Sequence, residues 1–323
     1  MSLSWITATA LVTAFVSYRI LRGMRPMPSV AGRRVVIVGA SSGIGRSMAL
    51  QYAQRGAHLL LCARRKRMLD QVVEDCQSVV VQPGTVHAVA GDITDRDTQI
   101  ALRDRAMELW DGMVDYLVLN AGMISVRQVA DLWDIDVATD SQELPPISVD
   151  RACADRADGM MRQMMDINLH APVTVAGLFL PMLAHAKGCI VVISSMAALV
   201  AAPTRSLYTA SKQAASGYFN ALRMEIGARL GVAVTIAYPG TVDTDLRQSA
   251  VDSSPCGDAE ASASAVGSQS GKMSPNTCAR QIIRAAALRE RELVTPLPYR
   301  ISVALYALAP SLVEHMAKKK YGL

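Results

Sequence analysis

Short apolar runs alternate with longer amphipathic segments along most of this chain. Six runs after Arg33 are apolar at nearly every successive position, and they lie at Val35–Val38, His58–Cys62, Val86–Ala90, Tyr116–Leu119, Ile190–Ile193 and Val232–Tyr238. Strands of a parallel sheet covered by helices on both sides have this continuous apolar pattern. Glycines typical of helix ends precede four of the runs, at Gly56, Gly112, Gly188 and Gly231. The chain is therefore predicted to have an α/β fold with a doubly wound parallel sheet, the Rossmann fold, in one domain over residues 29–298.

Two polar segments interrupt this alternation. Residues 131–158 hold eight acidic residues and two consecutive prolines, which predicts a solvated insertion. Residues 249–274 are rich in Ser, Ala and Gly, a composition that cannot pack a core and predicts a mobile segment. Beyond it we expect a helix over Cys278–Leu288.

Both ends of the chain are apolar and carry basic flanks. Met1–Tyr18 contains no charged residue, and Arg19, Arg22 and Arg25 follow it. Residues 1–28 are therefore predicted to form a transmembrane anchor that leaves the folded domain in the cytosol, with a helix lying on the bilayer as the alternative. In the C-terminal residues 299–323, the apolar segment Ile301–Leu312 is too short to span and is followed by three lysines. It is predicted to lie at a membrane surface or to pack against the protein.

Composition narrows the classes of function. Hydrophobic residues make up 51% of the chain and charged residues 19%, which excludes a disordered protein and agrees with membrane contact. The net charge of +5 comes from residues 1–69, which carry eleven basic residues and no acid. Basicity confined to one end, with few aromatic residues, argues against a nucleic-acid surface. The six cysteines are scattered without a C-x-x-C pair, so neither a metal site nor a disulfide framework is predicted.

A glycine-rich turn follows the first predicted strand. Its sequence, Gly39-Ala40-Ser41-Ser42-Gly43-Ile44-Gly45, leads directly into a helical segment. Glycines there allow a tight turn, the approach of a pyrophosphate to the helix N-terminus, and close packing of helix on strand. Gly39, Ser41, Ser42, Gly43, Ile44 and Gly45 are therefore predicted to bind a dinucleotide.

The end of the second predicted strand indicates which dinucleotide. An enzyme that uses NAD needs an acidic residue there for the ribose hydroxyl, but this chain has Ala63-Arg64-Arg65-Lys66 and no acid before Asp70. A guanidinium suits a ribose phosphate because its planar fork donates two hydrogen bonds. Arg64 and Arg65 therefore favour NADP(H), with Arg64 expected to matter more. The alternative is a solvated basic start to the next helix.

A tyrosine and a lysine on one helix face are the strongest chemical signal. Tyr208 and Lys212 stand four residues apart in Tyr-Thr-Ala-Ser-Lys, and Ser195 ends the preceding strand. An ammonium on the same face is expected to lower the pKa of the phenol from about 10 toward the range of a general acid.

Taken together, these motifs resemble those of the short-chain dehydrogenase/reductase family, along about residues 32–288. The family's elements occur in order: the glycine-rich turn, Asp92, Asn120-Ala121-Gly122, Asn168, Ser195, Tyr208 and Lys212, and Pro239-Gly240 with Thr244. The resemblance implies that Tyr208 donates a proton, Ser195 polarises a carbonyl and Lys212 binds the nicotinamide ribose. It further implies that Asn168 holds a water of the proton relay. Asp92, Asn120, Pro239, Gly240 and Thr244 are implied in cofactor binding, and residues 249–274 occupy the position of the substrate lid.

The apolar ends and the two arginines resemble membrane-anchored members of the family that act on lipid or steroid carbonyls. The resemblance implies an NADPH-dependent reductase of a hydrophobic ketone in the endoplasmic reticulum membrane, with its catalytic domain facing the cytosol. The alternatives are an oxidative hydroxysteroid or retinol dehydrogenase and a catalytically silent dinucleotide-binding scaffold at a membrane. The expected partners are a hydrophobic small molecule and the membrane, without nucleic acid, and the sequence leaves a homo-oligomer open.

Overall fold

A parallel sheet of seven strands forms the centre of the protein. The computed structural model describes residues 25–133, 135, 150–246, 250–251 and 272–321, so most of the predicted anchor, insertion and lid lies outside the described residues. The strand order is β3-β2-β1-β4-β5-β6-β7, and every neighbouring pair is parallel. The strands are β1 Arg34–Val38, β2 His58–Ala63, β3 Val86–Ala90, β4 Tyr116–Leu119, β5 Cys189–Ile193, β6 Ala233–Pro239 and β7 Glu292–Thr295. This confirms the predicted doubly wound α/β fold.

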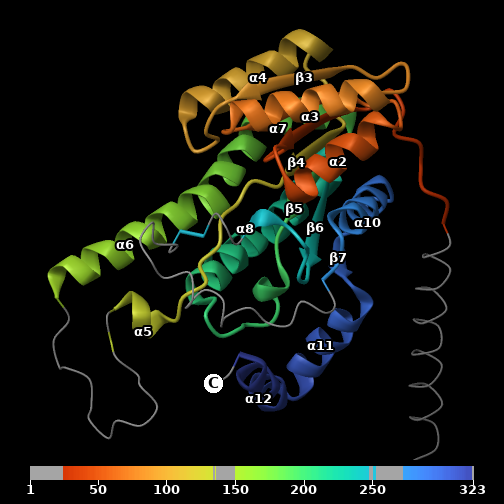
Figure 1. The fold of residues 1–323 in the computed structure, drawn as a ribbon. Coiled ribbons are helices and arrows are strands. Elements are labelled where there is room, and N and C mark those ends of the chain that lie inside the picture. The colour runs from red at the N-terminus through yellow and green to blue at the C-terminus, as the bar shows by residue number, and fades with distance from the viewer. Residues whose placement is uncertain (1–24, 134, 136–149, 247–249, 252–271, 322–323) are drawn as a thin grey trace, which may run out of the picture.

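Helices cover both faces of this sheet (Figure 1). One face packs against α2 (Gly43–Ala53), α3 (Lys66–Val79) and α10 (Pro275–Ala287). The other packs against α4 (Arg96–Trp110), α7 (Ala171–Ala186) and α8 (Ser206–Leu230). Because the side chains of a strand alternate between its faces, each strand contributes to both hydrophobic cores.

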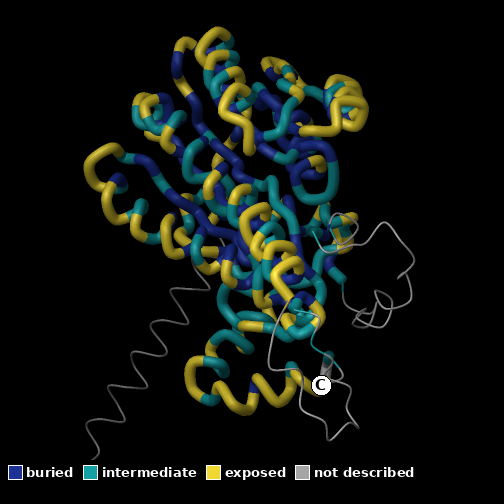
Figure 2. Tube along the Cα trace, turned by 90° about the vertical axis from the view of Figure 1, so that its left-hand side faces the viewer, coloured by how far each residue is buried: buried dark blue, intermediate teal, exposed yellow. Residues whose placement is uncertain are grey.

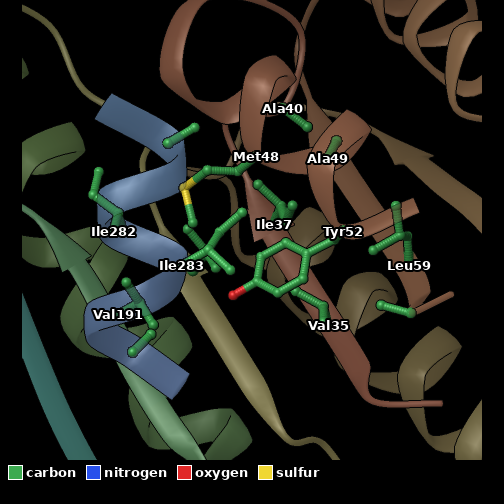
Figure 3. Packing of buried hydrophobic residues seen from close by; sticks show 14 of the residues in the cluster. Val35, Ile37, Ala40, Met48, Ala49, Tyr52, Leu59, Val191, Ile282 and Ile283 are labelled. Carbon is green, nitrogen blue, oxygen red and sulfur yellow. The ribbon is translucent and has the colours of Figure 1, made fainter. Parts of the chain in front are cut away.

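The packing of α2 against α10 illustrates the first of these cores. In Figure 3, Met48 and Tyr52 of α2 lie next to Ile283 of α10 and Ile37 of β1, and Ile282 lies on the other side of α10. All five side chains are buried. This contact holds the helix that follows the glycine-rich turn in a defined position over the sheet.

Two strands differ from the prediction. β3 is an edge strand, and among its residues only Val86 is buried, so the expectation of burial on both faces is wrong there. β7 was not predicted, because its four residues begin with an acid and are too short to show a pattern.

The glycines before the strands have two different roles. Gly56, Gly112 and Gly231 have positive φ, as expected near a helix end. Gly188 does not, because Lys187 occupies the left-handed position after α7. A Cβ at position 188 would lie 2.7 Å from the Val114 carbonyl oxygen. Gly188 is therefore required by close backbone packing, and the predicted helix-end role is wrong for it.

The end of the predicted insertion is helical. Helix α6 spans Arg151–Met165 and continues through a π-helical turn, η1 (Asp166–His170), into α7. Cys153, Ala157 and Met164 are buried along one side of α6, a helical spacing that the acidic composition obscured. Within the described part of the chain, residues 151–186 are the one helical stretch long and apolar enough to cross a membrane. The α7 part packs its apolar face on the sheet, so we interpret it as a core helix.

The C-terminal tail forms two helices instead of one apolar segment. α11 spans Leu297–Leu308 and α12 spans Pro310–Tyr321, with the break at Ala309. Both helices extend below the sheet and are exposed over much of their surface (Figure 2). We define the tail stripe as the large exposed apolar residues of these helices: Leu297, Ile301, Leu308, Leu312 and Met316.

Candidate functional site

A cleft of about 640 Å³ lies at the carboxyl ends of the central strands. Parallel α/β sheets bind their ligands at this edge, where the strand order reverses between β1 and β4. Fifteen of the predicted site residues line the cleft: Gly39, Ser41, Ser42, Gly43, Ile44, Arg64, Arg65, Asp92, Asn120, Ser195, Tyr208, Lys212, Pro239, Gly240 and Thr244. Gly45 and Asn168 are not part of its lining. The structure thus brings together residues that are dispersed over some 200 positions of sequence.

The glycine-rich turn has no room for larger side chains. Gly39 has a φ of +84°, and a Cβ there would lie 2.6 Å from the Ala121 backbone nitrogen. A Cβ on Gly45 would overlap the Gly39 carbonyl oxygen. That oxygen accepts a 2.8 Å hydrogen bond from the Asn120 side chain, so Asn120 fixes the turn against the end of β4. Gly45 therefore acts by helix packing.

The two arginines at the end of β2 point to different partners. Arg65 donates hydrogen bonds to the hydroxyls of Ser42, at 2.8 Å, and Ser41, at 3.2 Å. Arg64 forms a 3.3 Å ion pair with Asp92. Arg65 is therefore the arginine joined directly to the turn, although the sequence favoured Arg64.

Asp92 is held in one orientation by its own neighbours. Its Oδ1 accepts hydrogen bonds from the Thr94 backbone and hydroxyl. Burial alone would raise the pKa of Asp92, but the Thr94 hydrogen bonds and the Arg64 charge outweigh burial and lower it. The side chain is therefore an ionised acceptor at the cleft wall.

The predicted catalytic side chains meet at the opposite end of the cleft. Tyr208 is in the first turn of α8, and Ser195, which follows β5, lines the same cleft and is near enough to the phenol to lower its pKa. One turn further along α8, Lys212 donates a 3.1 Å hydrogen bond from Nζ to the Ile193 carbonyl oxygen. The Lys212 nitrogen lies 5.9 Å from the centre of the Tyr208 ring. The three residues are thus positioned by one helix and one strand end.

The electrostatics of this group differ from the expectation for the phenol. Burial raises the pKa of Tyr208, and the nearby Ser195 and the charge of Arg205 oppose it only in part. The predicted lowering by Lys212 is not what the structure shows. Burial instead lowers the pKa of Lys212 itself to about 8, because a buried ammonium loses its hydration.

Asn168 is buried next to the cleft and is not part of its lining. It lies in the π-helical turn η1, 2% exposed, and its amide bonds both the nitrogen and the oxygen of Met123. It also donates to the Ser211 hydroxyl at 3.0 Å. The side chain therefore fixes the loop after β4 against α8. The water-holding role implied by the family stays a prediction.

Two further residues near the site were not predicted. Arg205, immediately before α8, is 5% exposed and donates a 3.0 Å hydrogen bond to the Ser125 carbonyl oxygen. Tyr299 of α11 packs on Gly240, where a Cβ would overlap the tyrosine ring. Neither position belongs to a motif in the sequence, and both are identified only by long-range contacts.

The cleft suits a dinucleotide. Gly39 and Gly45 let the turn pack closely at the N-terminus of α2, where a pyrophosphate would bind. Ser41 and Ser42 of the turn and Arg65 at the end of β2 line this part of the cleft and can donate hydrogen bonds. Tyr208, Ser195 and Lys212 stand at the far end, where a donor, a polarising hydroxyl and a cation are within reach of one reacting group. Among the residues that the structure describes there is no cluster of three or more metal-ligating side chains.

Comparisons with known proteins identify the family. The family model for short chain dehydrogenases matches residues 33–254. An 11-beta-hydroxysteroid dehydrogenase A of Sesamum indicum is 31% identical over 90% of this chain and 76% of its own length. Dehydrogenase/reductase SDR family member 7B of Xenopus laevis is also 31% identical, over 91% of this chain and 84% of its own length.

Solved structures show the same fold. A short chain dehydrogenase/reductase from Burkholderia phymatum in complex with NAD superimposes with a TM-score of 0.70 at 23% identity, over 88% of this chain and 96% of that chain. An alcohol dehydrogenase from Thermococcus sibiricus, complexed with 5-hydroxy-NADP, gives a TM-score of 0.62 at 21% identity, over 83% of this chain and 97% of that chain. With the family model covering most of the catalytic domain and the site assembled in the expected order, this chain belongs to the short-chain dehydrogenase/reductase family of oxidoreductases.

Proposed function

We propose that this protein is an NADPH-dependent reductase of hydrophobic ketones, such as steroid or lipid carbonyls. The observation that carries the proposal is that Tyr208, Ser195 and Lys212 line one end of a dinucleotide-sized cleft, with the Lys212 nitrogen 5.9 Å from the Tyr208 ring. A catalytically silent scaffold has no physical need for this combination, so an enzyme is favoured.

Each of the three residues has a role in proton transfer. A nicotinamide cofactor bound in this cleft would supply the hydride for the carbonyl carbon. Ser195 donates a hydrogen bond to the carbonyl oxygen and polarises it, and Tyr208 donates the proton that this oxygen requires. Burial keeps the Tyr208 phenol protonated at neutral pH, since it raises the pKa, which suits a general acid. The Lys212 ammonium beside the ring offers positive charge as the phenolate forms.

Cofactor preference is inferred from the end of β2. Arg64 and Arg65 line the cleft there, where an NAD site would carry an acidic residue. With the Ser41 and Ser42 hydroxyls next to Arg65, this corner offers charged and neutral donors to a ribose phosphate.

The substrate class is inferred from the apolar surroundings of Tyr208. It packs in a small cluster with Ile124, Met164 and Ala250, and Met123 and Leu246 pack against this cluster. Met123 and Leu246 also line the cleft. The names of the relatives include hydroxysteroid dehydrogenases, which agrees with a hydrophobic substrate and also supports the oxidative direction as the second candidate.

Membrane attachment completes the proposal. The apolar residues 1–18 with their basic flank are proposed to anchor the chain in the endoplasmic reticulum membrane, with the catalytic domain in the cytosol. The tail stripe is an exposed apolar surface of the kind that lies on lipid, and Lys318 and Lys319 follow it. A hydrophobic substrate would then be available where the enzyme is held.

The test is turnover of NADPH and NADH with a panel of steroid and lipid ketones, compared between the unmodified enzyme and Tyr208→Phe. We expect NADPH-dependent reduction, and a loss of about 100- to 10,000-fold in kcat in the variant, the range for general acid catalysis. NADPH binding, measured by fluorescence titration, should remain within about threefold because the phenol proton serves the reaction. More than a tenth of the activity in Tyr208→Phe, or preference for NADH, would contradict the proposal.

A further inference from the structure

A buried arginine precedes the catalytic helix, and the proposed proton transfer has not used it. Arg205 is 5% exposed, and it directly precedes α8, three residues before Tyr208. Burying a guanidinium is costly unless its charge and donors are used, so its position calls for a physical explanation. Its backbone carbonyl begins α8 by accepting a 2.6 Å hydrogen bond from Thr209.

The Arg205 side chain leaves the helix and reaches the loop that follows β4. Its Nη1 donates a 3.0 Å hydrogen bond to the carbonyl oxygen of Ser125, which is 1% exposed. Two residues earlier, the same loop is held by the two hydrogen bonds between Asn168 and Met123. Met123 and Ile124 of this loop pack in the cluster that contains Tyr208. Arg205 and Asn168 therefore both hold the loop that forms the apolar surface next to the phenol.

We infer that Arg205 is a positioning residue for proton transfer by Tyr208: its buried guanidinium ties the loop after β4 to the start of α8 and keeps a positive charge beside the phenol. This inference rests on the proposed function, because it assigns Arg205 an effect on the acid that the proposal names. A purely structural arginine would stabilise the fold without altering the acidity of Tyr208.

The groups around the phenol support an effect of this charge. Arg205 comes from the residue before α8 and Lys212 from α8 itself, and Ser195 comes from the segment after β5. The loop after β4 and helix α6 contribute the apolar Ile124 and Met164. Asp166 and Asp245 line the same cleft but are solvent-exposed, and Asp166 is paired with His170. The Arg205 charge lowers the pKa of Tyr208 in opposition to burial.

The experiment measures the pH dependence of kcat in full-length Arg205→Gln and Arg205→Lys. Removing the charge raises the pKa of Tyr208. The midpoint of the profile therefore moves to higher pH in Arg205→Gln, whether the assay follows reduction, which needs the phenol, or oxidation, which needs the phenolate. We expect a shift of about one pH unit, the lower end of what a neighbouring charge produces. Arg205→Lys keeps a charge and should restore the original midpoint.

Arg223→Gln is the matched control. Arg223 is on the same helix and also donates to a backbone carbonyl, that of Val234 at 2.9 Å, but it lies about 27 Å further along α8. Its loss should lower stability without moving the midpoint. A midpoint unchanged in Arg205→Gln, or moved equally in Arg223→Gln, would overturn the inference.

Two further measurements keep the outcomes distinct. If Tyr208→Phe retains activity, the proposed function fails; if Tyr208→Phe is inactive and Arg205→Gln has an unchanged profile, only this inference fails. If Arg205→Gln does not fold, Arg205→Lys decides: faster amide hydrogen exchange at residues 123–126 with an unchanged midpoint supports the inference. Unchanged exchange, or a displaced midpoint in Arg205→Lys, overturns it.

Discussion

The two arginines at the end of β2 differ in their hydrogen-bond partners, and the partner determines how much of the arginine's charge is available to a bound phosphate. Arg64 already has a carboxylate partner in Asp92, whereas Arg65 is bonded to the neutral hydroxyls of Ser41 and Ser42. The positive charge of an arginine that is already paired with a carboxylate is divided between that carboxylate and an incoming phosphate, so the phosphate is bound less strongly. Arg65 is therefore better placed to recognise a ribose phosphate at the glycine-rich turn.

We expect Arg65→Ala to weaken NADPH binding by about 1.5 to 3 kcal/mol, the range for hydrogen bonds to charged groups, with little change for NADH. Arg64→Ala should weaken NADPH binding less, because the Arg65 contact remains. The smaller loss that we expect comes from Asp92, which is then freed to repel the phosphate. Isothermal titration with both cofactors measures the difference. Arg67→Ala is the control, since Arg67 is exposed on α3 and does not line the cleft. Equal losses for NADPH and NADH would show that Arg65 only supports the turn.

At the scale of elements, one carboxylate joins the start of β1 to the start of β4. Asp115 is 4% exposed and accepts hydrogen bonds from Arg33 Nη1, from the Arg34 backbone and from Arg34 Nε, at 2.7 to 2.9 Å. Burial works to raise the pKa of Asp115, but the hydrogen bonds from Arg34 and Arg33 outweigh it and lower the pKa. The ionised form therefore stabilises the centre of the sheet.

Asp115→Asn should lower the free energy of unfolding at pH 7 by about 1.5 to 3 kcal/mol. Because the folded pKa is below the unfolded value of about 3.9, this contribution is complete above that value and is lost as the pH falls through the folded pKa. The difference between the two proteins should accordingly shrink below about pH 4. Urea unfolding at pH 7 and in acid measures it, with the exposed Asp104→Asn as a control of near-zero effect. A difference that is independent of pH would contradict the role given to the charge.

The elements also show which features a sequence reveals. Six strands and a helix over most of Cys278–Leu288 followed from local patterns. Five of these strands are apolar because they are buried at nearly every position, and β3 is the exception. The glycine-rich turn and the pair Tyr208 and Lys212 could also be identified from the sequence, because the residues of each motif lie within a few positions of one another. β7 was missed because its pairing with β6, and not its composition, makes it a strand.

The unpredicted features depend on contacts between distant segments. Gly188 is required by the Val114 carbonyl, and Arg205 is explained by the Ser125 carbonyl. The raised pKa of Tyr208 results from burial among residues of three elements, which spacing on one helix does not show. The break at Ala309 is different, because Pro310 begins α12 and disfavours a helical conformation in the residue before it, a local signal within the apolar segment Ile301–Leu312.

At the scale of the whole molecule, residues 25–27 contact the catalytic domain. The Arg25 carbonyl oxygen accepts a hydrogen bond from Arg284, and Met27 packs against the core beside α10. A truncation that preserves both contacts removes residues 1–24 rather than 1–28. We expect this protein to fold, to retain turnover and to leave membranes for the most part.

The truncated protein also tests the tail stripe. Residual binding to anionic lipid vesicles should be present at about 0.05 M salt and fall by about 0.5 M, as screening weakens the attraction of Lys318 and Lys319. Vesicle co-sedimentation measures it. Ile301→Glu with Leu308→Glu should abolish the residual binding, and Glu314→Gln is the control because it alters an exposed charge of α12 outside the stripe. Firm attachment at high salt would contradict a single N-terminal anchor.

The tail contacts the nucleotide cleft at Gly240. Gly240 lines the cleft, its amide donates to the Thr295 carbonyl at 2.7 Å, and the Tyr299 ring fills the space where a Cβ would stand. A larger residue at position 240 would have to displace the Tyr299 ring or be accompanied by a smaller residue at position 299. We therefore expect the effects of substitutions at the two positions to be coupled, so that a variant at either one is best interpreted together with the residue present at the other.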